Sequence, residues 1–193
     1  MHWRPRMAVL VASYGAATVL GVVSWRFAPD TAVNLAINIV IVSFFAFFEE
    51  IGWRGYMLPK LETGYPRLAP ALVGFLHGVW HLPLMLLTTA YNPIGNRFIV
   101  VPLFLAVLTA AGVLYGYLRD ASGSLWPVVV IAHGTFNAVL GMLAGAAVAE
   151  YPALAAYLTG ETGIFTLLAI VIVAWVLVRR PATGQERRLV VQE

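Results

Sequence analysis

The chain has 193 residues, of which 61% are hydrophobic and only 11% are charged, and it contains no cysteine. An apolar fraction well above the roughly 45–50% of soluble domains favours a membrane protein, and the lack of cysteine excludes a disulfide framework, a thiolate zinc site and a cysteine nucleophile. The net charge of +3 does not indicate a nucleic-acid partner, because the basic residues lie between apolar runs, where they would orient a membrane protein.

Six apolar segments are long enough, or nearly so, to cross a bilayer as helices of roughly 20 residues. In chain order they are Met7–Phe27, Val33–Leu58, Leu68–Ala90, Phe98–Leu118, Leu125–Val148 and Gly163–Val178. The sequence therefore predicts an all-α fold, a polytopic transmembrane helix bundle of about six spans. Residues 1–180 would form this membrane-embedded domain, and residues 181–193 a short cytoplasmic tail.

The positive charges predict how the bundle is oriented. With a cytoplasmic N-terminus, nine Lys and Arg residues fall inside and two outside, while Arg54 lies within a span. The inside residues are Arg4, Arg6, Lys60, Arg67, Arg119, Arg179, Arg180, Arg187 and Arg188, and the outside ones are Arg26 and Arg97. Since positive charges accumulate on the cytoplasmic side, we expect both termini in the cytoplasm.

Ionisable side chains inside the predicted spans indicate a functional site, because such groups are costly in a bilayer and usually face the bundle interior. They are Glu49, Glu50, His77, His81 and His133, joined by the amide of Asn137. At 1.5 Å per helical residue, five of them (Glu49, the histidines and Asn137) lie roughly 12–20 Å from the predicted cytoplasmic ends of their spans. Three helices would thus present polar groups at one depth, in the cytoplasmic half of the bilayer.

The spacing of these residues suggests separate roles for the two acids. Glu50 and Arg54 are four residues apart with the acid first, the orientation that favours an ion pair on one helix face. Glu49 points about 100° away around the same helix. We therefore expect Glu50 to be a structural partner of Arg54, and Glu49 to project toward a cavity.

Two further pairs have the same spacing. His77 and His81 are four residues apart, as are His133 and Asn137, so each pair can face one point and could bind a metal or polarise a water molecule. His77 could instead be a packing histidine that is hydrogen-bonded to a neighbouring span. Trp53 and Trp80 lie beside this cluster and would pack its walls.

Three motifs in order resemble those of a known family. They are Glu49-Glu50-x-x-x-Arg54, His81 within GVWHLPL, and His133-x-x-x-Asn137. The pattern is similar to that of the CAAX protease and bacteriocin-processing (CPBP, or Abi) family, intramembrane endopeptidases similar to the type II CAAX prenyl endopeptidase. The resemblance covers about residues 44–140, and the phrase EEIGWRGYMLPKL looks like the family's bacterial branch. It implies an integral protein of a bacterial inner membrane that cleaves membrane-associated peptides or proteins.

The resemblance also implies roles for individual residues. Glu49 resembles the general base that activates a water molecule, and His81 its partner in holding that water. His133 and Asn137 resemble the pair that stabilises the oxyanion, while Arg54 resembles the arginine that fixes the acidic motif, with Glu50 in support. This glutamate mechanism needs no cofactor.

One departure from the family pattern keeps a metal mechanism open. The second motif of the family is usually Phe-x-x-x-His, but His77 stands four residues before His81. If zinc were bound, its ligands would come from Glu49, His77, His81 and His133.

Other chemistries and functions remain as alternatives. The motifs HExxH, GxGD and GxSG of other intramembrane proteases are absent. A protein without catalytic activity, such as a small transporter or an immunity or scaffold protein, could use the same buried polar cluster.

Overall fold

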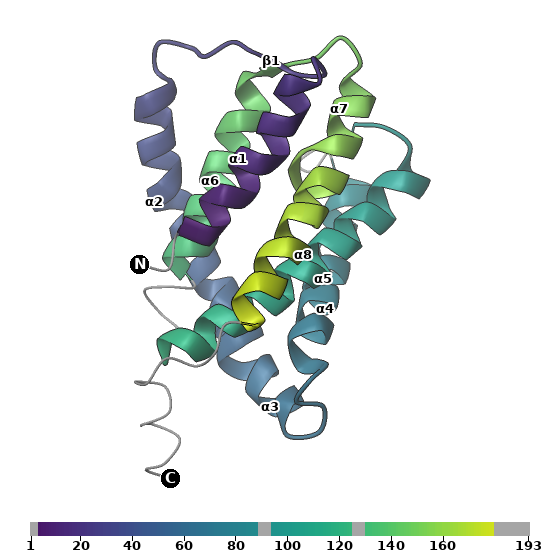
Figure 1. Cartoon of the computed structure of the whole chain (residues 1–193). Coiled ribbons are helices and arrows are strands. Elements are labelled where there is room, and N and C mark those ends of the chain that lie inside the picture. Colours follow the sequence, from purple (N-terminus) through teal and green to yellow (C-terminus); the bar gives the residue numbers. More distant parts are fainter. Residues whose placement is uncertain (1–3, 89–93, 125–129, 180–193) are drawn as a thin grey trace.

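The computed structural model describes residues 4–88, 94–124 and 130–179, and it forms a bundle of helices (Figure 1). The long helices are α1 (Arg4–Val19), α2 (Thr31–Glu50), α4 (Ala69–Leu87), α5 (Arg97–Ser122), α6 (Ile131–Ala146) and α8 (Ile164–Val178). The short elements are the π-helix Ile51–Met57, α3 (Leu58–Glu62), α7 (Pro152–Leu158), the 3-10 turn Gly160–Thr162, and the strands β1 (Ser24–Trp25) and β2 (Ala147–Val148). The predicted all-α membrane bundle is thereby confirmed, while the predicted tail at 181–193 lies outside the described residues.

Each predicted span corresponds to one long helix, but the helices differ in length. In the part of the chain that the structure describes, three helical runs are long and apolar enough to cross a membrane: Thr31–Glu62, Ala69–Leu87 and Arg97–Ser122. The first of them joins α2, the π-helix and α3 without a break. Met7–Val19 and Ile164–Leu177 are apolar but shorter. The apolar side chains of α2 are largely exposed, as for Val40 at 70% and Phe44 at 61%, which suits a helix that faces lipid.

The first and fifth predicted segments end differently from the prediction, which extended them as helix to Phe27 and Val148. Helix α1 stops at Val19, and Gly21 adopts a positive φ of 71° that L-residues with side chains rarely tolerate. The chain then forms β1, which pairs antiparallel with β2 directly after α6. Figure 1 shows this small sheet and α7 at one end of the bundle, here called the β end, and α3 at the opposite end, here called the α3 end.

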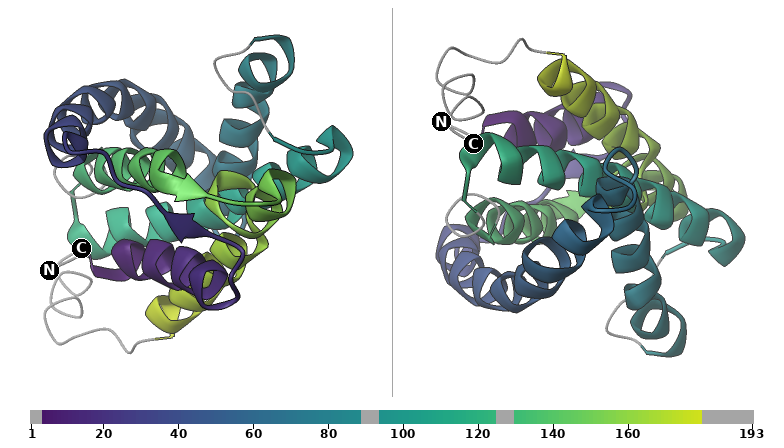
Figure 2. Two further views of the ribbon diagram at one scale, coloured as in Figure 1. Left: turned by 90° about the horizontal axis from the view of Figure 1, so that it is seen from above. Right: turned by 90° about the horizontal axis from the view of Figure 1, so that it is seen from below.

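The long helices pack against one another in pairs. Helix α4 packs on α5, α5 on α8, α8 on α1, and α6 on α2. Figure 2 shows α2 at the periphery of the bundle beside α6. The main apolar core joins α1, α5 and α8 and includes Val9, Leu114 and Ile170. A buried hydrogen bond of 2.8 Å between the hydroxyls of Ser13 and Thr166 also ties α1 to α8.

Glycines allow α4 to lie close to α5, and α6 to lie close to α2. Small residues permit such close approach in membrane helix bundles. A Cβ atom built on Gly74 of α4 would lie 2.9 Å from the Cα atom of Gly112 of α5. A Cβ atom on Gly134 of α6 would lie 2.5 Å from the Cα atom of Ser43 of α2. The second crossing determines how α2, which carries the two acids, is placed against α6, which carries His133.

We expect Gly134→Ala to destabilise the protein by about 1–3 kcal/mol, the usual cost of overpacking a tight contact. The added methyl group meets backbone and side-chain atoms of Ser43, so α2 and α6 must move apart. Gly141→Ala on the same helix is the matched control, because a Cβ there meets nothing within 4 Å. Unfolding of both variants in detergent measures the difference, and equal stabilities would contradict the close crossing.

Candidate active site

The two acids lie at a change of helix type. Glu49 and Glu50 are the last residues of α2, and the π-helix begins at Ile51. Such wider helical turns are rare and often occur at functional sites. Arg54 lies on the π-helix, and its Nη1 donates to Oε1 of Glu50 at 2.7 Å, with both side chains almost fully buried. The predicted Glu50–Arg54 ion pair is confirmed.

This ion pair also links three helices. Nδ1 of His133 on α6 donates to the same Oε1 of Glu50 at 2.8 Å. The guanidinium of Arg54 lies 4.7 Å from the ring centre of Tyr115 on α5, a cation–π contact. Among the described residues, Oε2 of Glu50 and Nε of Arg54 have no hydrogen-bond partner. The buried charges therefore depend on the few contacts that they do make.

Glu49 has different surroundings from its neighbour. Its Oε2 accepts a hydrogen bond from Nε2 of His77 on α4 at 3.1 Å and lies 3.9 Å from Nε2 of His133. The Glu49 side chain is 25% exposed, whereas that of Glu50 is fully buried. The structure thus separates the two acids as the spacing predicts, with Glu49 as the accessible one.

The two histidines of α4 lie next to Glu49. Nδ1 of His81 donates to the carbonyl oxygen of His77 at 3.1 Å, so a neutral His81 ring carries its lone pair on Nε2. One possible ligand atom from each of Glu49, His77 and His81 lies within 4.8 Å of the others. These three side chains therefore meet as predicted, and His77 is both a partner of a neighbouring span and part of the cluster.

Aromatic rings enclose the cluster. Trp53 stacks on His77, with ring centres 4.9 Å apart and planes inclined by 29°. The ring centres of Trp80 and His81 are 4.8 Å apart. The predicted role of both tryptophans as walls of the site is confirmed. Tyr115, whose ring lies 5.4 Å from that of His133, was not predicted, because nothing in the local sequence marks a tyrosine on another helix as a neighbour.

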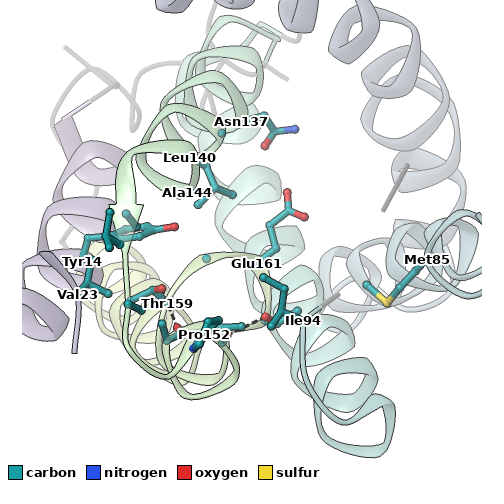
Figure 3. Close-up of a pocket in the computed structure, with 18 residues that line it drawn as sticks. Tyr14, Val23, Met85, Ile94, Asn137, Leu140, Ala144, Pro152, Thr159 and Glu161 are labelled. Carbon is teal, nitrogen blue, oxygen red and sulfur yellow. Dashed lines mark hydrogen bonds between the residues drawn. The ribbon is translucent and has the colours of Figure 1, made fainter. Parts of the chain in front are cut away.

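Asn137 lies one helical turn beyond His133 on α6. It lines a cavity of about 650 Å³ between α6, α1, α7 and the end of α4 (Figure 3). His133 instead is turned toward the two acids, through Nδ1 to Glu50 and Nε2 to Glu49. The joint role of His133 and Asn137 at one point stays a prediction.

Comparison with known proteins gives two matches. A family model described as "Type II CAAX prenyl endopeptidase Rce1-like" matches residues 31–139, a range that contains every residue of the cluster. A stretch of 48 residues is 40% identical to CAAX prenyl protease 2 of Methanococcus maripaludis, covering 24% of this chain and 18% of that protein. The aligned part thus spans less than a fifth of the curated relative. No solved structure matches the chain.

Proposed function

Because the chain belongs to the type II CAAX prenyl endopeptidase (Rce1-like) family, whose model matches more than half of it, we propose that it is an intramembrane endopeptidase acting on membrane-associated peptides or proteins. Its apolar helices and its family make it an integral membrane protein. The observation that carries the proposal is the contact of Glu49, an accessible carboxylate inside the bundle, with two histidines from separate helices.

Glu49 acts as the general base in this proposal. Its carboxylate removes a proton from a water molecule, whose oxygen attacks the carbonyl carbon of the scissile peptide bond. The hydrogen bond from His77 fixes the carboxylate. The lone pair on Nε2 of His81 accepts a hydrogen bond from the other O–H group of the water and so holds the water in place. When the C–N bond breaks, the protonated Glu49 returns its proton to the leaving nitrogen.

Asn137 and His133 stabilise the oxyanion of the tetrahedral intermediate. The Asn137 amide borders the cavity and can donate directly. His133 already donates from Nδ1 to Glu50, so it contributes a second hydrogen bond when Nε2 also carries a proton. In a site with little water such donors are worth far more than in bulk solvent. Glu50 and Arg54 are positioning residues that hold His133 in place.

The metal-dependent alternative uses the same side chains. Glu49, His77 and His81 would hold the ion, with His133 close by, and a bound zinc would lower the pKa of its water. These residues fit such an ion by type and proximity. We propose the metal-independent mechanism, because Glu49, His81, His133 and Asn137 already provide a base, a group that holds the water and two oxyanion donors.

We expect the purified protein in lipid nanodiscs to cleave membrane-embedded peptides, and this cleavage to survive treatment with a chelator. Products are identified by mass spectrometry, and bound metal is measured on the same active sample. Stoichiometric zinc, together with activity that is lost on chelation and restored by zinc, would exclude the metal-free mechanism. In that case His77→Ala should also lose the metal. A protein that binds peptides but never cleaves them would instead support the scaffold alternative.

We also propose that both termini are cytoplasmic and that the active site lies in the cytoplasmic half of the inner membrane. Helix α1 begins and α8 ends on the side of the bundle toward the α3 end (Figure 1). Among the described basic residues, Lys60 lies on α3 and Arg119 donates to Glu62 of α3, as expected if this side is cytoplasmic. A reporter enzyme that is active only outside the cytoplasm should be silent when it is fused after Glu193. An active fusion would reverse the proposed orientation.

A further inference from the structure

The polar side chains of helix α2 fall on two sides of the helix. Ser43 and Glu50 share the side that packs on α6. At about 100° per helical residue, the other polar residues of α2 lie together within an arc of about 60°. They are Thr31, Asn34, Asn38 and Glu49. We call this arc, with Phe45 inside it, the Asn38 face.

The Asn38 face leads directly to the proposed base. At one end of it, Oε2 of Glu49 accepts the hydrogen bond from His77 at 3.1 Å, so this side of α2 is turned toward α4. Asn38 lies eleven residues before Glu49 on the same side, a distance of about 16 Å along the helix axis. A molecule that lies along this face therefore reaches Glu49 without crossing another helix.

Beyond Glu49, the described residues leave the Asn38 face open. Asn38 is exposed, and Phe45 is 61% exposed. Helix α4 packs on α5 rather than along α2. Its Leu84, seven residues after His77 and on the same face of α4, is 41% exposed. The two helices thus meet at the Glu49–His77 contact and leave the surfaces beyond it uncovered.

The amide of Asn38 indicates what kind of molecule this face binds. Asn34 donates to Asp30 at 2.9 Å, whereas Asn38 forms no hydrogen bond with a described residue. The outer side of α2, with Val40 and Phe44, is apolar and exposed, as suits contact with lipid. An amide without a partner is costly in apolar surroundings, and an acyl chain has no group that can pair with it. The Asn38 face therefore fits a partner that has hydrogen-bonding groups.

A peptide that is being cleaved has such groups in its main chain. Within a helix the peptide carbonyl is already hydrogen-bonded, so the segment that reaches Glu49 must be unwound. Its freed N–H and C=O groups then need partners inside the membrane. An asparagine amide both donates and accepts, so Asn38 can pair with either group. An extended chain rises about 3.3 Å per residue, so it reaches from Glu49 to Asn38 in about five residues.

We infer that the Asn38 face binds an unwound apolar segment of the substrate peptide, and that the Asn38 amide hydrogen-bonds to its main chain about five residues from the scissile bond. This inference rests on the proposed function, since it places the scissile bond at Glu49. It makes Asn38 a specificity-determining residue, which selects substrates by how readily the segment unwinds rather than by a particular side chain.

The test measures the binding of fluorescently labelled synthetic peptides to the Glu49→Gln variant in nanodiscs, so that affinity does not require cleavage. Each peptide has about 24 residues of Leu and Ala, with a central Gly-Pro pair that unwinds it. In a matched series, an ester replaces one peptide bond at a time and so removes one N–H donor. We expect the ester to weaken binding about five- to tenfold at one or two positions, the effect of one lost hydrogen bond.

Asn38→Leu, added to the same variant, identifies the partner of the sensitive position. It should bind the all-amide peptide about five- to tenfold more weakly, and it should no longer distinguish that peptide from the sensitive ester. Asn38→Leu combined with Val40→Asn is the matched control, because it moves the amide about 160° around α2 to the lipid-facing side. This control should bind like Asn38→Leu. Unchanged affinity in Asn38→Leu, an equal loss for both peptides, or recovery in the control would each overturn the inference.

Two further measurements separate a peptide from other partners of this face. Because the chain has no cysteine, Phe45→Cys should form a disulfide under mild oxidation with a cysteine placed beside the Gly-Pro pair, and Val40→Cys should not. Equal cross-linking at both positions would overturn the inference. The mass of the assembly and the unfolding midpoint should not fall in Asn38→Leu. A fall in either would assign Asn38 to a contact between two copies of the chain and would also overturn the inference.

The two proposals can fail separately. If the protein with Glu49 intact cleaves the peptide and Asn38→Leu leaves KM unchanged, the proposed function stands and the inference is wrong. If the ester series shows binding through Asn38 but the protein with Glu49 intact cleaves none of the peptides, the face binds unwound peptides and the proposed enzymatic function is wrong.

Discussion

Glu49→Gln is expected to lower the rate of peptide cleavage by roughly 100- to 10,000-fold, the usual contribution of a general base. Glutamine retains the shape of the side chain and an oxygen that accepts the hydrogen bond from His77 but cannot take a proton from water. Because the side chain is 25% exposed, its neutralisation should leave the unfolding midpoint close to that of the parent protein. Single-turnover cleavage in nanodiscs, with unfolding measured on the same samples, checks both statements.

The control for Glu49→Gln is Glu150→Gln, which makes the same chemical change at an exposed acid outside the cluster. It should retain the parent's cleavage rate and stability. Normal cleavage by purified Glu49→Gln protein would remove Glu49 from the role of base. A large loss of stability in that variant would assign Glu49 a structural role like that of Glu50.

Glu50→Gln is expected to destabilise the fold by about 3–5 kcal/mol, the usual cost of removing one partner of a buried ion pair. The change leaves the Arg54 charge, which is 1% exposed, without its carboxylate. It also weakens the hydrogen bond that His133 donates at 2.8 Å, so the contact between α2 and α6 loosens. Denaturant or thermal unfolding in detergent measures the loss.

A double variant separates the ion pair from general damage to the core. Glu50→Leu combined with Arg54→Met removes both charges, and it should be more stable than Glu50→Gln because no buried charge is left unpaired. Its cleavage should remain low, since His133 loses the group that orients it. If Glu50→Gln were as stable as the parent protein, the buried pair would not hold the helices together.

The features that the sequence by itself determined follow from residues that are close together along the chain. The apolar runs dictate a membrane bundle, because a backbone in lipid must satisfy its hydrogen bonds within helices. The pairing of Glu50 with Arg54 follows from their separation by four residues on one chain. The grouping of Glu49, His77 and His81 was predictable because their depths can be counted along straight helices.

Only the tertiary structure decided which side chains face each other across helices. Spacing placed His133 and Asn137 on one face of α6, but only the packing of that helix shows that His133 contacts Glu50 and that Asn137 lines the cavity. This packing includes the contact of Gly134 with Ser43, residues 91 positions apart. The pairing of β1 with β2 and the cavity that residues of α1, α6 and α7 line together likewise join distant segments. They depend on backbone hydrogen bonds and packing between those segments, which the periodicity within one segment does not contain.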